Sequence, residues 1–149
     1  MTAVTAPSAT ASRSGLLQTY RLLAGLSVVL VLILAVLAGR SSRLFGTGNI
    51  EVHGFIGELL FAIAVVMVVL SFMTQTRGVV VGHAVAFAAL CFVQIGLGFV
   101  GRETLEAAAW HIPNGVLLMG LAVAHLTLIL PDRSPQPDRS AMRARRSSP

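Results

Sequence analysis

Charge is scarce in this chain of 149 residues: Asp, Glu, Lys and Arg make up only 11% of it, whereas 55% is hydrophobic. A soluble domain of this size has no core large enough to bury so much apolar surface. The composition therefore excludes an ordinary water-soluble protein and favours a membrane protein.

Cysteine is nearly absent, since Cys91 stands alone and an intrachain disulfide is impossible. Cys91 falls within an apolar run, which is typical of a small buried hydrophobic side chain. The chain also lacks a His-Glu-x-x-His spacing and a set of cysteine ligands. A zinc hydrolase is disfavoured on both grounds.

Four long apolar runs are present, and each is long enough to cross a hydrocarbon core of about 30 Å. They predict an all-α fold, an integral membrane antiparallel four-helix bundle over residues 16–130. The expected spans are about 16–38, 53–74, 78–100 and 111–130. Pro113 is expected in the first turn of the last helix, where its missing N–H costs little, with His111 at or just before the helix start.

Both ends of the chain are rich in small and polar residues. Residues 1–15 predict a disordered tail, and 131–149, with four Pro and five Arg, a disordered basic tail. We expect the first span to be retained rather than cleaved as a signal peptide, because its apolar stretch exceeds a typical signal core.

All eleven basic residues are arginine, and their positions predict an orientation. With the N-terminus in the cytoplasm, eight arginines fall on the inner side and three, Arg40, Arg43 and Arg102, on the outer side. This bias fits a plasma-membrane protein with both termini in the cytoplasm. The basic C-terminal tail is expected to meet anionic lipid headgroups, and no nucleic-acid partner is expected.

All four histidines lie in or at the ends of the spans. His111 and His125 are fourteen positions apart, which is roughly 21 Å along a helix and within about 40° of the same face. The predicted topology puts His53 at the depth of His111 and His83 at the depth of His125. Two His–His pairs stacked across a bilayer could each ligate a haem iron, and intramembrane ionisable groups favour a functional interpretation.

Further residues fit this hypothesis. Gly115, one turn from His111, would leave clearance for a porphyrin, as Ala122 would beside His125. Gln94 would reach the outer half of the bundle, where it either donates to the cofactor or an axial imidazole, or bonds a neighbouring helix. Arginines at both depths could pair with haem propionates, or simply mark the membrane interfaces.

The strings Phe92-Val93-Gln94-Ile95-Gly96-Leu97-Gly98 and Trp110-His111-Ile112-Pro113-Asn114-Gly115 carry a resemblance to known proteins. Over roughly residues 50–128 the chain resembles one half of a haem A synthase, and still more the small four-span bacterial membrane proteins of unknown function with that architecture. The resemblance implies a haem between His53 and His111. Those synthases have eight spans, however, and a glutamate where this chain has Ile50, so catalysis is not implied. His83 and His125 resemble instead the inner ligands of di-haem transmembrane cytochromes.

Three functions remain open from the sequence. The first is binding of haem b, one outer and a second inner, for transmembrane electron transfer or haem handling. The second is a non-enzymatic membrane subunit or scaffold with structural histidines. The third is a haem-modifying enzyme formed by a homodimer; a larger membrane complex is a further arrangement.

Overall fold

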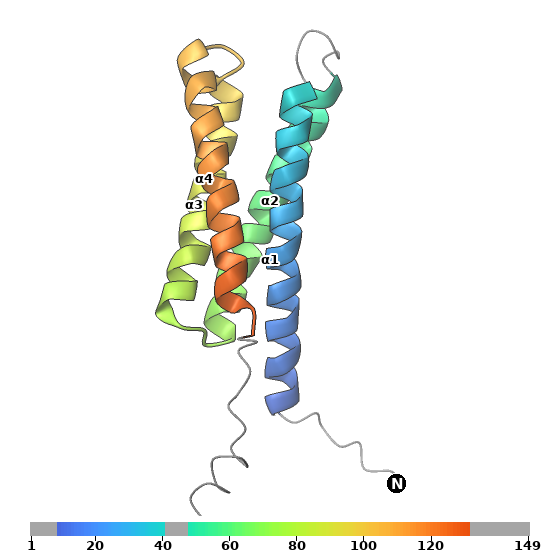
Figure 1. Ribbon diagram of the computed structural model, residues 1–149, viewed down its shortest axis with the longest axis vertical. Helices are drawn as coiled ribbons and strands as arrows, with labels where there is room; N and C mark the ends of the chain where they lie inside the picture. The colour runs from blue at the N-terminus through green and yellow to red at the C-terminus, as the bar shows by residue number, and fades with distance from the viewer. Residues whose placement is uncertain (1–8, 41–47, 132–149) are drawn as a thin grey trace, which may run out of the picture.

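The computed structural model describes residues 9–40 and 48–131, and within them the chain forms four α-helices (Figure 1). These are α1 (Ala9–Arg40), α2 (Gly48–Met73), α3 (Gly78–Val100) and α4 (Leu105–Ile129). Each is long and apolar enough to cross a membrane. The all-α prediction of a multi-pass four-helix bundle is confirmed.

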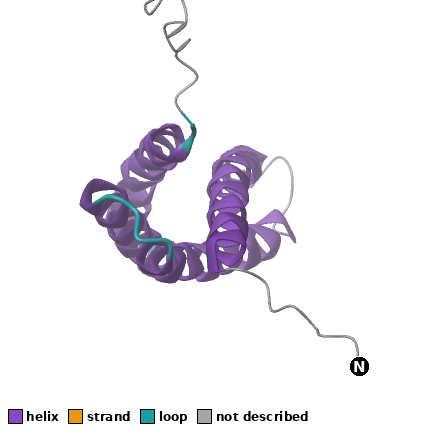
Figure 2. Cartoon of the chain, turned by 90° about the horizontal axis from the view of Figure 1, so that it is seen from below, coloured by secondary structure: helices purple, strands orange, loops and turns teal. Residues whose placement is uncertain are grey.

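The helices stand in the ring order α1, α2, α3, α4, and α1 also contacts α4 (Figure 2). We call the end with the α1–α2 and α3–α4 connections the His111 end, and the opposite end the His125 end. Figure 1 shows α1 and α4 approaching each other towards the His125 end and separating towards the other. Most large apolar side chains on the outside of the bundle remain exposed, as a lipid-facing surface requires.

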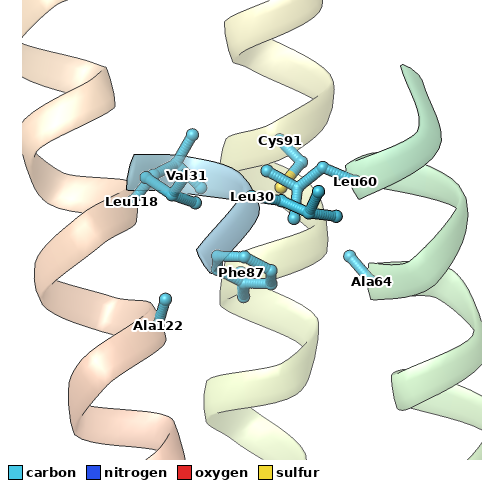
Figure 3. Close-up of a cluster of buried hydrophobic side chains, with 8 residues drawn as sticks. All are labelled: Leu30, Val31, Leu60, Ala64, Phe87, Cys91, Leu118 and Ala122. Carbon is cyan, nitrogen blue, oxygen red and sulfur yellow. The ribbon is translucent and has the colours of Figure 1, made fainter. Parts of the chain in front are cut away.

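The interior is apolar between the two ends. One cluster fills the middle of the bundle with side chains from all four helices: Leu30, Val31, Leu60, Ala64, Phe87, Cys91, Leu118 and Ala122 (Figure 3). A second cluster near the His125 end contains Tyr20, Ala24, Met67, Leu70, Val80 and Ile129. Both clusters hold the helices together, and the first separates the two levels at which the histidines lie.

The connection between α2 and α3 is a turn of four residues, 74–77. Thr74 and Thr76 bond back to the end of α2, and Gln75 adopts a positive φ of 50°. So short a turn makes α2 and α3 antiparallel neighbours, as the sequence predicted.

Three helix starts differ from the prediction. The helix α1 begins at Ala9, so residues 9–15, expected to be disordered, are helical, and α2 begins at Gly48 rather than near residue 53. Arg13 stabilises the start of α1, because its guanidinium donates to the carbonyl oxygen of Thr74 at 3.0 Å and ties α1 to the α2–α3 turn. The remaining parts of both predicted tails, 1–8 and 132–149, lie outside the described residues.

The start of α4 also differs from the expectation that Pro113 lies in the first turn. The helix begins at Leu105, with Thr104 as N-cap accepting a bond from the Ala107 N–H, so that Pro113 lies inside the helix rather than in its first turn. His111 is therefore a helical residue in the second turn. The hydroxyl cap at Thr104 gave a stronger start signal than the proline.

Candidate functional site

The structure brings both predicted histidine pairs together. The ring centroids of His53 and His111 lie 6.0 Å apart, across the bundle between α2 and α4. Those of His83 and His125 lie 6.2 Å apart, between the neighbouring helices α3 and α4. The helix α4 thus contributes one imidazole to each pair, one near each end of the bundle.

His53 is held by the first helix. Its Nδ1 lies 3.1 Å from the carbonyl oxygen of Leu34 on α1. Since a carbonyl oxygen only accepts, Nδ1 carries the hydrogen, and Nε2 of the neutral ring keeps its lone pair. Metal-binding histidines are commonly oriented by such a bond from the other ring nitrogen.

His111 packs against α3 at a glycine. A Cβ placed on Gly98 would lie 3.3 Å from Cε1 of the His111 ring, so the ring occupies the space that a side chain there would need. Nδ1 of His111 is buried and has no hydrogen-bond partner among the described residues. The ring is thus positioned by packing while one of its polar atoms stays unsatisfied.

Gln94 and Asn114 form an amide network beside this pair. Gln94 donates from Nε2 to the carbonyl oxygen of His111 at 3.0 Å, and its Oε1 accepts from Asn114 Nδ2 at 2.6 Å. Asn114 also donates to the carbonyl oxygen of Leu90. Gln94 therefore bonds the neighbouring helix, the second of the two roles expected for it, and it contacts the main chain of His111 rather than the ring.

Protein side chains fill the space beside both small residues that were expected to leave clearance for a porphyrin. A Cβ on Gly115 would lie 3.3 Å from Nε2 of Gln94, so that side chain fills the space over the glycine. Ala122 is part of the central apolar cluster. Clearance beside either histidine therefore requires neighbouring side chains to move.

The second pair has a partner that the sequence did not predict. The hydroxyl of Tyr20, on α1, lies 2.7 Å from Nε2 of His125, and both side chains are buried. Nδ1 of His125 and Nδ1 of His83 are buried without a partner among the described residues. This level of the bundle therefore contains a Tyr–His–His cluster with two unsatisfied nitrogens.

The pair distances fit one metal ion between two imidazoles. With metal–nitrogen bonds of about 2 Å on opposite sides, two ring centres lie roughly 6 Å apart. Packed aromatic rings adopt similar separations, so distance alone does not identify a ligand. Nδ1 of His83, His111 and His125 is buried without a partner among the described residues, and a buried polar atom left unsatisfied costs about 1–3 kcal/mol.

A metal site made of protein ligands alone has less support. The described residues contain no cluster of three or more His, Cys, Asp or Glu side chains, whereas a closed zinc site needs four ligands. Pairs of imidazoles could instead supply two ligands to the metal of a cofactor that brings its other ligands with it.

Of the arginines expected near propionates at the His111 end, Arg102 is well placed. It lies over the Phe99 ring, 5.5 Å from its centroid, and near Gly54, one residue from His53. At the other end, Arg21 and Arg77 bond main-chain carbonyl groups of α4. Arg43 and Arg133 lie outside the described residues.

Tyr20, Asn114 and the Leu34 carbonyl group are the contacts that sequence reasoning missed. Asn114 carried a signal, because a buried amide in a membrane span must find an interhelical partner. Tyr20 carried only a weak one, as the single tyrosine of the chain. A main-chain carbonyl acceptor carries none.

Comparison with protein-family models, with curated proteins and with solved structures finds no match for this chain.

Proposed function

We propose that this chain is a haem b protein of the plasma membrane, with His53 and His111 as the axial ligands and both termini in the cytoplasm. The observation that carries the proposal is the pair of imidazoles on α2 and α4, with ring centroids 6.0 Å apart and planes tilted by 51°. The Leu34 bond takes Nδ1 of His53, so that Nε2 of the neutral ring keeps its lone pair. The excess of arginine on the inner side supports the orientation.

The remaining residues near the pair would complete the site. Arg102 is the candidate for a propionate, because guanidinium groups pair with carboxylates through two parallel bonds. The Gln94–Asn114 network fixes α3 against α4, and so fixes the backbone from which His111 projects. Haem would supply one-electron redox chemistry between two imidazoles, and the protein would set its potential through burial.

The number of haems bound distinguishes haem handling from transmembrane electron transfer. One haem at the His111 end suits haem handling at one membrane face, whereas transfer of electrons across the bilayer needs a second centre at the His125 end. A second haem would require the Tyr20 hydroxyl to leave Nε2 of His125. We therefore propose a single haem and a haem-handling role.

The test is the visible spectrum and haem content of purified full-length protein after haem supplementation. We expect one haem per chain and a low-spin six-coordinate spectrum. His53→Ala and His111→Ala should each remove that component, because a missing axial ligand ends six-coordination. Absence of a Soret band would refute haem binding and leave the histidines as structural residues of a membrane subunit.

His83→Ala and His125→Ala are the matched controls, since they remove buried imidazoles of the same kind from the other level. With one haem, both variants keep the full spectrum. Two haems per chain, one of them lost on His125 substitution, would replace haem handling with a transmembrane relay. An eight-span dimer in a detergent mass measurement would instead favour the haem-modifying enzyme.

A further inference from the structure

Three arginines surround a cavity at the His125 end, about one helical turn beyond the Tyr20–His125 bond. The cavity has a volume of about 580 Å³ and lies between α1, the α2–α3 turn and the end of α4. Arg13 and Arg21 reach it from α1, and Arg77 from the residue before α3. The chain therefore gathers three positive charges at one end of a membrane-spanning bundle.

These guanidinium groups keep most of their hydrogen-bonding capacity. Arg13 makes two bonds to the Thr74 carbonyl oxygen, and Arg21 and Arg77 one each to carbonyl oxygens at the end of α4. With five N–H groups on each side chain, four of fifteen are used by acceptors among the described residues. Stabilisation of helix C-termini accounts for those four bonds, but not for the eleven remaining donors.

No carboxylate among the described residues is available to them. The described acidic residues are Glu51 and Glu58 in the first half of α2, and Glu103 and Glu106 around the α3–α4 connection. All four lie away from the His125 end, and no ion pair forms between them and the three arginines. The positive charge at the cavity is thus available to an anionic group from outside the described structure.

The walls of the cavity indicate the kind of anion. Apart from the arginines, the lining combines the apolar side chains of Leu17, Val80, Leu128 and Ile129 with the polar Thr74 and Thr76 of the turn. A group with a charged phosphate and a hydrocarbon part matches this mixture better than a free ion does. Basic pockets between membrane helices bind the headgroups of anionic lipids in the same way.

We propose that this cavity binds the phosphate headgroup of an anionic phospholipid, held by Arg13, Arg21 and Arg77. The site is separate from the His53–His111 pair and does not depend on haem binding. It ties together the start of α1, the α2–α3 turn and the end of α4 through one ligand.

The test compares the affinity of full-length protein in detergent for phosphatidylglycerol, measured by native mass spectrometry, with that for phosphatidylcholine and inorganic phosphate. We expect phosphatidylglycerol to bind preferentially. Arg21→Gln combined with Arg77→Gln should weaken it by about fivefold for each arginine removed. Arg40→Gln is the matched control, an exposed arginine in the last turn of α1 at the opposite end, and should bind the lipid as the wild type does.

Arg21→Lys combined with Arg77→Lys guards against a folding defect, because these substitutions keep the charge. The logarithm of the affinity for phosphatidylglycerol should keep at least half of its wild-type value. Helix content by circular dichroism restricts the comparison to folded variants, and Arg77→Gln alone serves if the double variant fails to fold. Unchanged affinity in the folded Gln variants, equal binding of phosphatidylcholine, or competition by inorganic phosphate at the lipid's own concentration would overturn the proposal. So would binding that appears only after Asp132→Asn and Asp138→Asn, because the chain's own carboxylates would then be the occupants.

Discussion

The hydroxyl of Tyr20 lies 2.7 Å from Nε2 of His125 and so joins the first helix to the last across 105 positions of the sequence. The two rings also meet edge to face, 5.5 Å between centroids and 85° between planes. Since Nδ1 of His125 has no partner among the described residues, this bond is the only polar contact of that side chain there. Loss of this bond would leave the imidazole of His125 without any polar partner among the described residues.

Tyr20→Phe should lower the free energy of unfolding by about 1–3 kcal/mol, because it leaves both nitrogens of a buried imidazole unsatisfied. Unfolding in mixed detergent measures the change. In a His125→Ala background the same substitution should cost much less, since the partner is already gone. Equal costs in the two backgrounds would show that the hydroxyl does not interact with His125.

Gly98→Ala should disturb the His111 ring, which lies 3.3 Å from the position of the new Cβ. We expect weaker haem binding, measured by titration, because the imidazole must move by a few tenths of an ångström. Gly96→Ala, two residues away on the same helix with nothing within 4 Å of its Cβ, is the control and should bind haem normally. An equal loss in both variants would trace the effect to the helix rather than to the ring.

Gln94→Leu should destabilise the bundle by about 0.6–2 kcal/mol, the range measured for interhelical hydrogen bonds in membranes. It removes the acceptor of Asn114 and the donor to the His111 carbonyl oxygen. Thr127→Val is the comparison, because the hydroxyl of Thr127 bonds only within its own helix and is exposed. If thermal unfolding showed the two variants to be equally stable, the network would have no role in holding α3 against α4.

The proposed orientation predicts which engineered cysteines react with an impermeant reagent in intact cells. In a Cys91→Ala background, Leu105→Cys should be modified, because Leu105 is 91% exposed beside the α3–α4 connection. Thr47→Cys should react as well, and Ser140→Cys should not. Labelling at position 140 alone would reverse the orientation.

Much of the architecture followed from the sequence because a bilayer imposes simple rules. An apolar run of sufficient length must form a helix, since lipid offers no partner for its main-chain polar groups. Helical geometry then placed His111 and His125 on one face, and the antiparallel order brought His53 and His83 to their depths. Both centroid distances agree with that reasoning.

The rest depended on packing details that periodicity does not encode. The ring rotation that directs Nδ1 of His53 to Leu34, and the one that brings His125 to Tyr20, arise from side chains on a different helix. The predicted start of α4 rests on Pro113, whereas the helix begins after the N-cap Thr104. A proline within a membrane helix is tolerated where neighbouring groups satisfy the freed carbonyl.

The dependence of both histidine levels on α1 sets an order of assembly during synthesis. His53 is oriented by Leu34 of α1 and lies beside His111 of α4, and His125 of α4 is bonded to Tyr20 of α1, so neither level is complete until the fourth helix has joined the others. The first helix leaves the ribosome well before the fourth. A haem held by His53 and His111 would consequently be loaded after insertion of the last span, as a late step in maturation.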